Sequence, residues 1–544
     1  MKKILIIGSG ISGLTSAIGI AQSGSTAVLV SPYLSERAQS VMAAGGINVS
    51  KQTGEDTIES HVEDTLNGGR KIAGKNTVTS LCSDAPEILK WLESLGVVFN
   101  RDQNGEIDRR AFGGQRFKRT AFAGASTGKQ IVTALIQKAR EFEKAGLIER
   151  RIGLNFHSAL IENGKCYGAI FYSQTDRALE TIYADAMIIA TGGQNSLFGK
   201  TTGSVLCDGY AAGKLFMQGA AMKNLEFIQY HPTTIETPLK RMLITEAARG
   251  EGGRLYYLDS DKRVYFMEDK FGERGNLMPR DVVSKCIYDV LPRQVYLDIS
   301  FLGKKQISER LKEVDELCER YLGLDVSKES IPVAPSVHFF MGGFAVDSRH
   351  RTSIEGVYAV GECASIYHGA NRLGGNSLLA AVHSARTAVN DILSLPESEK
   401  AVPDFTDEIS SRTAEFNEYM QTESKFPAVY VLKAMEKIMN EDMGISRDEK
   451  RLKEGIESLD YYISICDKIR YDSALSPSQC YSIHAMLVLA RAILTSAEAR
   501  KETRGSHIRN DYPETSDDFA KCSVIHYNSG KFDITYESED EICW

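Results

Sequence analysis

The stretch from Ser336 to Leu379 carries residue types suited to binding a small anion. It places His338 before a Met-Gly-Gly turn, a short apolar strand before Gly361-Glu362, and Arg372 within a loop rich in glycine and asparagine. A strand that runs into such a loop is typical of the carboxyl edge of a parallel sheet, where ligands bind. Arg372 could there hold a carboxylate through two parallel hydrogen bonds. An arginine on an ordinary surface loop is the alternative.

Further candidate side chains lie between residues 222 and 332. His231 is predicted to lie at the end of a strand that Pro232 terminates. Glu246 and Arg249 are three residues apart, which puts them on one face of a helical turn. Met278-Pro279-Arg280-Asp281 is typical of a helix start, with proline in the first turn and an acid at the positive end of the helix dipole. Each feature also has a structural explanation, as a hydrogen-bonded histidine, a surface ion pair or a helix cap.

Three strand-to-loop crossings are predicted to position these groups. Residues 3–7 form a strand before the run Gly8-Ser9-Gly10-Ile11-Ser12-Gly13, a helix follows, and a second strand covers 27–30. Strand 186–190 runs into Thr191-Gly192-Gly193, and strand 357–360 runs into Gly361-Glu362. In a G-x-G-x-x-G turn, two glycines bring backbone close to a pyrophosphate, and the third packs the helix on the strand. The crossings at residues 8, 191 and 361 therefore predict one discontinuous dinucleotide-binding domain.

The second strand ends in Ser31-Pro32, where NAD-binding folds usually carry an acid for the adenosine ribose. This departure weakens the case for NAD, although the Ser31 hydroxyl can still bond a ribose. Residues 43–48 then combine small side chains with paired glycines, which suits backbone lying against a flat ring system. A plain glycine-rich loop is the alternative.

Composition restricts the class of protein. A chain of 544 residues predicts roughly two to four domains. Its 42% hydrophobic and 25% charged residues are typical of a soluble globular protein, and a net charge of −8 argues against a nucleic-acid binder. We expect no membrane-spanning run. The ten cysteines form no C-x-x-C pair, so we expect reduced thiols, no metal site and no internal electron relay.

Ten segments resemble, in the same order, the flavoprotein subunits of succinate dehydrogenase and fumarate reductase. They read GSGISGL, AAGGIN, AFGGQ, FIQYHPT, ITEAARGEGGR, NLMPRDVV, VHFFMGGF, VYAVGECA, HGANRLGGNSLL and ETRGSHIRNDYP. L-aspartate oxidase shares most of this set and is the close relative to exclude. The resemblance implies bound FAD, with fumarate and succinate as the substrate pair.

The resemblance also implies partners. These are a separate iron–sulfur subunit, together with a quinone-reactive membrane anchor, with this chain cytoplasmic or held at the cytoplasmic face of the inner membrane. The polar C-terminal region and the helices before it are candidate docking surfaces for them, and a soluble enzyme with a diffusible donor is the alternative.

We predict an α/β fold with a Rossmann-like FAD-binding domain in two parts, 1–221 and 333–395. An α+β capping domain is inserted at 222–332, a linker covers 394–405, a helical domain spans 396–500, and a small C-terminal region with two short strands spans 501–544.

The resemblance assigns roles to the candidate residues. Arg372 and His338 would hold one substrate carboxylate, and His231 with Thr245 the other, because two anionic ends need two sets of donors. Arg280 would give a proton to the substrate carbon and be resupplied through Glu246 and Arg249. A guanidinium group releases protons reluctantly, so this role rests on resemblance alone. The full predicted substrate site is Phe112, His231, Thr245, His338, Arg372 and Gly374. The predicted cofactor-binding residues are Gly8, Ser9, Gly10, Ser12, Gly13, Ser31, Gln39, Ser40, Ala44, Gly45, Gly46, Thr191, Gly192, Asp208, Glu362, Asn376, Ser377 and Leu378.

Two departures from the family pattern are informative. Many members carry R-S-H-S, whose histidine bonds FAD covalently, whereas this chain has Arg37-Ala38-Gln39-Ser40. An amide is not nucleophilic, so we predict noncovalent FAD, a lower flavin potential and a preference for fumarate reduction. L-aspartate oxidases also bind FAD noncovalently, but they have a glutamate, suited to the substrate ammonium, where this chain has Phe112. The alternatives are an L-aspartate oxidase and a noncatalytic flavin-binding assembly subunit.

Overall fold

A five-stranded parallel sheet forms the centre of the computed structural model, which describes residues 1–124, 126–396, 401–422 and 424–544. The predicted linker at 394–405 therefore lies partly outside the described residues. The strand order is β19-β10-β1-β2-β6, with β1 Lys3–Ile7, β2 Thr26–Ser31, β6 Ile148–Ile152, β10 Ala186–Ile189 and β19 Val357–Ala359. The central strands are nearly continuous buried apolar runs, as expected for a parallel sheet covered on both faces.

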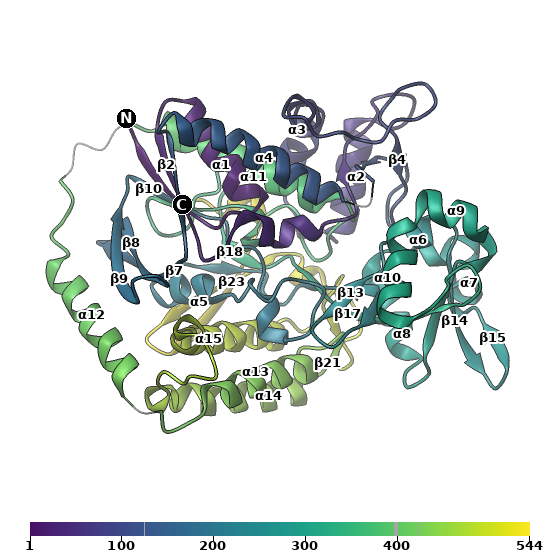
Figure 1. The fold of residues 1–544 in the computed structure, drawn as a ribbon. Helices are drawn as coiled ribbons and strands as arrows, with labels where there is room; N and C mark the ends of the chain where they lie inside the picture. Colours follow the sequence, from purple (N-terminus) through teal and green to yellow (C-terminus); the bar gives the residue numbers. More distant parts are fainter. Residues whose placement is uncertain (125, 397–400, 423) are drawn as a thin grey trace.

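Helices α1 (Ile11–Gln22), α4 (Thr127–Lys144) and α11 (Asn376–Ser394) pack together on this sheet (Figure 1). Because β1, β10 and β19 are neighbours and parallel, the loops that follow them meet at one edge. The α/β fold and the three predicted crossings are confirmed.

A second lobe, which we call the inserted lobe, lies to the right of the sheet in Figure 1 and has a hydrophobic core of its own. The chain enters it along β12 (Ile228–Glu236) and returns along the antiparallel partner β17 (Ile331–Phe340). Its six-stranded sheet has the order β13-β12-β17-β16-β14-β15. Its other elements are β13 Arg241–Leu243, α6 Ala247–Gly250, β14 Arg254–Asp259, β15 Lys262–Val264, α7 Phe266–Phe271, α8 Arg280–Asp289, β16 Val295–Asp298, α9 Gly303–Arg310 and α10 Lys312–Leu322.

The strand that carries His231 does not end there, and this prediction was wrong. β12 continues through Pro232 to Glu236, and its pairing with β17 is irregular between His231 and Thr234. Proline has no N–H for the ladder, so it is tolerated where pairing is interrupted. His231 therefore lies within a rigid strand rather than in a loop.

The helices α12 (Thr406–Gln421), α13 (Ala428–Asp442), α14 (Glu449–Ser464) and α15 (Pro477–Ala499) follow the parallel-sheet domain, as the periodicity predicted. By length and composition, α15 is apolar enough to cross a membrane, a feature that the sequence analysis did not note. However, 78% of its most apolar window is buried inside the protein. Helices α5 (Tyr210–Met217), α13 and α14 pack against it, so the structure uses α15 as a core helix.

The C-terminal region is an integral part of the fold. The hairpin of β23 (Cys522–Asn528) and β24 (Lys531–Glu537) extends a sheet that also contains β11 (Met222–Lys223), β18 (Gly343–Ala345) and β20 (Ala364–Ser365). The arginines of segment 500–509 are buried, and Arg500 donates to Glu226 at 2.5 Å. These arginines are therefore internal, with their charges paired inside the protein, whereas the docking role of the C-terminal region as a whole stays a prediction.

Candidate active site

A cavity of about 290 Å³ lies between the carboxyl edge of the parallel sheet and the inserted lobe. Its wall brings together side chains that are more than 250 residues apart in sequence. The predicted chemical residues in this wall are Phe112, His231, Thr245, Glu246, Arg280, His338 and Arg372. These predicted residues therefore converge on one cavity, whereas the third predicted arginine, Arg249, does not line it.

Arg280 is held by a buried carboxylate. It is the first residue of α8, and its Nε and Nη2 donate to Oε2 of Glu246 at 2.9 and 2.7 Å. Oε1 of Glu246 accepts from the Gly113 backbone N–H at 2.9 Å and lies 3.3 Å from Arg249 Nη2. Burial alone would raise the pKa of Glu246, but Arg280 and Arg249 lower it to about 2. The three side chains form a buried chain, Arg280–Glu246–Arg249.

Gln229 ties the two arginines of the cavity together, and our sequence interpretation missed it. Its side-chain oxygen accepts from Arg280 Nη1 and from Arg372 Nη2, both at 3.0 Å. Its amide nitrogen donates to Asn371 Oδ1 and to the Arg372 carbonyl, both at 2.8 Å. Because alternate strand residues share a face, the spacing of Gln229 and His231 was a signal that could have identified it.

The two histidines face each other across the cavity wall, with ring centroids 5.2 Å apart. Thr202, also missed, lies 2.8 Å from His338 Nδ1, and His231 Nδ1 lies 3.1 Å from the Thr233 carbonyl. Burial, then the positive charge of Arg280, holds the pKa of both histidines far below the usual value. Both rings are therefore neutral hydrogen-bonding groups.

Arginine side chains supply the positive charge of the cavity, and some of their N–H groups lack a hydrogen-bond acceptor in the described part of the chain. Burial and the neighbouring Arg280 lower the pKa of Arg372. Arg372 Nε and His231 Nε2 are buried and have no hydrogen-bond partner among the described residues. A small dianion would supply both the missing charge and the missing acceptors.

Phe112 forms an apolar part of the same wall. A Cβ added at Gly45 would lie 3.1 Å from the Phe112 ring, and one at Gly374 would lie 2.9 Å from it. The Gly374 position also faces Glu246 and Arg280, at 3.1 and 3.2 Å from the added Cβ. A side chain larger than glycine at 374 would therefore enter the site.

A second cavity, of about 160 Å³, continues from this site toward the end of β2. Gly10, Gln39, Ser40, Ala190 and Gly192 line both cavities. Together they form an elongated trench past the start of α1, whose N-terminus has no side-chain cap. The Ile11 N–H at this terminus donates to Ser40 Oγ at 3.3 Å. The shape of the trench and the position of the helix N-terminus fit a dinucleotide whose pyrophosphate lies at α1.

The glycines at this crossing leave no room for side chains. A Cβ at Gly8, where φ is +108°, would lie 2.3 Å from the Ala190 carbonyl oxygen, and one at Gly13 would lie 1.8 Å from the Gly8 carbonyl oxygen. Gln39 Oε1 is buried without a partner among the described residues, so it is available to an N–H or O–H donor of the cofactor.

The remaining predicted cofactor residues divide into two groups. The residues that line the trench are Gly8, Ser9, Gly10, Ser12, Ser31, Gln39, Ser40, Ala44, Gly45, Gly46, Thr191, Gly192, Asp208, Glu362, Ser377 and Leu378. Burial raises the pKa of Asp208 to about 6 and that of Glu362 to about 7. Gly13 and Asn376 do not line it.

The Asn376 side chain takes part in a hydrogen-bond network behind the trench. Its side-chain oxygen accepts from Asn48 at 2.7 Å and lies 3.1 Å from His61 Nε2, and its amide donates to Thr65 at 3.0 Å. These contacts join the start of α11 to α2 (Ile58–Gly68).

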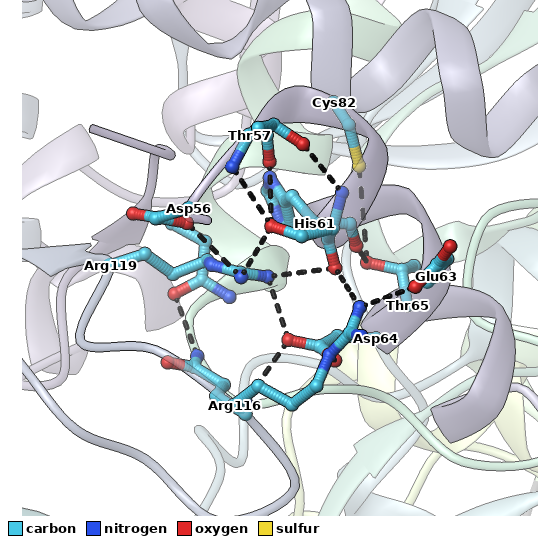
Figure 2. A network of polar contacts seen from close by, with 12 residues as sticks. Asp56, Thr57, His61, Glu63, Asp64, Thr65, Cys82, Arg116 and Arg119 are labelled. Carbon is cyan, nitrogen blue, oxygen red and sulfur yellow. Dashed lines mark hydrogen bonds and ion pairs between the residues drawn. The ribbon is translucent and has the colours of Figure 1, made fainter. Parts of the chain in front are cut away.

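Figure 2 shows how α2 itself is held. The fully buried Arg119 pairs with Asp64 at 2.9 Å and with Asp56 at 3.2 Å, and Arg116 also donates to Asp64 at 2.7 Å. α3 (Lys75–Ser94) packs beside α2 and contributes Cys82 to the view. These ion pairs hold α2 in place next to the start of α11, on the side away from the trench.

No group of three His, Cys, Asp or Glu side chains arranged to hold a metal ion occurs in the described ranges.

Known protein families match the N-terminal and the C-terminal parts of the chain. A family model described as an FAD binding domain matches residues 3–378, and one described as the fumarate reductase flavoprotein C-terminus matches residues 432–541. The succinate dehydrogenase flavoprotein subunit of Bacillus subtilis is 36% identical, covering 95% of this chain and 92% of its own. A fumarate reductase (CoM/CoB) component of Methanothermobacter marburgensis is 32% identical, covering 96% of each chain.

Solved structures agree with these matches. A mutated FrdA protein of E. coli quinol fumarate reductase superposes with a TM-score of 0.90 at 28% identity, covering 100% of this chain and 98% of that one. The resemblance and the FAD cofactor expected from the sequence are confirmed.

Proposed function

This chain belongs to the family of succinate dehydrogenase and fumarate reductase flavoprotein subunits and is an FAD-dependent oxidoreductase, and from that premise we propose that it reduces fumarate to succinate. The observation that carries the proposal is the convergence of two histidines and two arginines on one dicarboxylate-sized cavity beside the trench. The general interconversion of fumarate and succinate follows from the family. The direction and the residue roles are our proposal.

The cavity supplies separate donors for two carboxylates. Arg372 and His338 would hold one carboxylate, and His231 with the Thr245 hydroxyl would hold the other. The two histidines would contribute neutral hydrogen bonds, since Arg280 and burial keep their pKa values low. With both ends fixed, the alkene would be oriented for reaction rather than merely bound.

Arg280 would donate the proton to the substrate carbon. Its bonds to Glu246 and Gln229, and a side chain that is only 8% exposed, support this role. Proton release from a guanidinium requires a new proton to arrive nearly at once. The ionised Glu246, in contact with Arg249, would relay that proton.

FAD, when bound, supplies the hydride. Phe112 would exclude water above the alkene and offers no partner for a substrate ammonium, which disfavours aspartate as a substrate. Gln39 occupies the position of the family's linking histidine, so FAD would be held without a covalent bond. A lower flavin potential would follow, which favours fumarate reduction over succinate oxidation.

The comparisons do not identify one electron donor, because the similar proteins belong to different enzyme complexes. One belongs to a succinate dehydrogenase, whereas another belongs to a CoM/CoB fumarate reductase. We propose that the partner is an iron–sulfur subunit, in a complex that can include a quinone-reactive anchor at the cytoplasmic face of the membrane.

The proposal is tested anaerobically with reduced viologen as donor and fumarate as acceptor. Arg280→Ala is compared with Arg274→Ala, which removes an exposed arginine of the same lobe. Fumarate-dependent dye oxidation that is lost in the first variant and kept in the second, with equal FAD content, is the expected result. Peroxide formation from aspartate and oxygen, without fumarate reduction, would identify an L-aspartate oxidase. If both assays were silent with FAD bound, a noncatalytic flavin-binding subunit would replace the proposal.

A further inference from the structure

A small cavity of about 90 Å³ lies against Arg280 from outside the dicarboxylate site. Arg280 and Arg372 line both this cavity and the large one, so the two guanidinium groups separate the two spaces. Its other lining residues are Asn67, Gly68, Arg70, Gly113, Gly114, Pro279, Asn371, Leu373 and Gly374. The volume has room for several water molecules. Most of the lining area is apolar, but two asparagines and three arginines of the lining offer polar groups to such waters.

The outer end of this cavity reaches solvent. Asn67 is exposed, and the Arg70 side chain is 40% exposed. Arg70 also lines a surface cleft of about 660 Å³, where it lies 3.4 Å from Asp281. Asp281 in turn accepts from Asn371 at 2.9 Å, and Asn371 accepts from Gln229. Polar groups therefore run without interruption from the surface cleft to the partners of Arg280.

Glycine keeps the space beside Arg280 open. The nearest atom to a Cβ at Gly113 would be Glu246 Oε1, at 2.7 Å, and a Cβ at Gly374 would lie 3.2 Å from Arg280 Nη2. At Gly114, φ is +79°, a conformation that glycine adopts without strain. The cavity wall next to the guanidinium is thus formed by backbone, which leaves room for water.

The buried chain through Glu246 differs from this cavity in its access to solvent. The side chains of Glu246 and Arg249 are 1% and 0% exposed, and Arg249 Nη1 donates to the Asn276 carbonyl at 2.6 Å. The outer member of that chain is therefore itself buried. Arg280, in contrast, lines the small cavity, whose outer residues Asn67 and Arg70 are exposed or partly exposed.

We propose that water in the small cavity is a second proton supply for Arg280, parallel to Glu246 and Arg249. The inference rests on the proposed role of Arg280 as proton donor. When Arg280 gives a proton to the substrate carbon, the adjacent water protonates the guanidine and takes a proton from the next water. The net change is one proton drawn from solvent, with no electron transferred.

The test narrows the cavity without touching the groups that bind substrate. Gly68→Ala places its methyl 3.4 Å from the Asn371 carbonyl oxygen, at a position with ordinary φ, and Asn67→Phe covers the mouth. Gly444→Ala is a matched control, since its Cβ also meets a carbonyl oxygen at 3.4 Å, and Asn104→Phe is an exposed control.

Each substitution is made in two FAD-loaded parent chains, one with Glu246 intact and one that carries Glu246→Gln. With Glu246 present, narrowing should reduce fumarate turnover by less than about twofold, because the first route remains. In the Glu246→Gln parent, the same narrowing of the small cavity should reduce the residual fumarate turnover by about tenfold, because the route through water is then the only one left of two parallel routes.

Ammonium chloride, compared with tetramethylammonium chloride at equal ionic strength, provides a readout specific to proton supply. Ammonium is a small acid and should accelerate Glu246→Gln, and Gly68→Ala or Asn67→Phe should abolish that acceleration. The second route would be refuted by any of three results. Gly68→Ala or Asn67→Phe could reduce turnover by the same fraction with Glu246 as with Glu246→Gln, or could leave the ammonium acceleration unchanged. Glu246→Gln could also show no turnover at all. An unaltered chain that fails to reduce fumarate would instead refute the proposed function and this route with it.

Discussion

Glu246 accepts two hydrogen bonds from Arg280 through a single carboxylate oxygen, at 2.9 and 2.7 Å, in a site where both side chains are buried. The contact joins the segment between β13 and α6 to the first residue of α8, so the two ends of one charge pair come from different elements. A buried pair of this kind is costly to break, because the remaining charge is left without a partner.

The first prediction concerns stability and pH. The folded-state pKa of Glu246 is depressed from 4.5 to about 2, which corresponds to about 3 kcal/mol. A depressed pKa stabilises the fold above the unfolded value, and this contribution is lost as pH falls through about 4.5 toward 2. Glu246→Gln should therefore lower the free energy of unfolding by a constant amount from pH 8 to 5, and by less below pH 4.5.

Urea unfolding at several pH values measures this difference. Glu273→Gln, an exposed carboxylate of the same lobe, serves as the control and should change the free energy little at any pH. A Glu246→Gln penalty that grew as the pH fell would contradict the ionised state assigned to this carboxyl.

The second prediction concerns Gln229. Gln229→Leu keeps the side-chain volume but removes the oxygen that accepts from both Arg280 and Arg372. Each guanidinium would lose an oriented partner, so kcat/KM for fumarate should fall about 10- to 100-fold. Viologen-linked kinetics measures this, with FAD content as the check on folding and exposed Gln103→Leu as the control. Unchanged kcat/KM with full FAD content would mean that Gln229 does not position the arginines.

The third prediction concerns the attachment of FAD. Because Gln39 has no nucleophilic atom, acid precipitation should leave a colourless pellet and release all flavin to the supernatant. Gln39→His, which restores the imidazole of the family motif, is the companion variant. A yellow pellet from the unaltered chain would disprove noncovalent binding, whereas a yellow pellet from the variant alone would assign the difference to this side chain.

The parallel-sheet fold was predictable because its signals are local. β1 and the glycine turn before α1 are adjacent in sequence, and glycine alone fits where an added Cβ would overlap Ala190 or Gly8. The bend around His231-Pro232 was not predictable in the same way. Proline usually ends a strand, and only the irregular pairing of β12 with β17 reveals that this strand continues.

The roles of single residues were harder to predict than the fold, because they depend on contacts between distant segments. Asn376 stays a predicted cofactor residue, and its side chain is bonded to His61, Thr65 and Asn48. Thr202 lies in no segment that the sequence analysis singled out, and Gln229 lies in FIQYHPT without having been assigned a role. Their importance comes from partners distant in sequence. Side-chain direction depends on packing between elements, and sequence spacing does not report it.

The amino-acid sequence by itself determined the strands, the glycine turns and the kinds of donor available, because backbone conformation and side-chain chemistry are local properties. Tertiary structure decided which of those donors share one cavity, which are buried and which are paired. Burial lowers the pKa values of His231 and His338, whereas the neighbouring arginines lower that of Glu246 against the effect of burial. Both effects arise only when the inserted lobe packs beside the parallel sheet. The chemistry of the site is therefore a property of the folded chain.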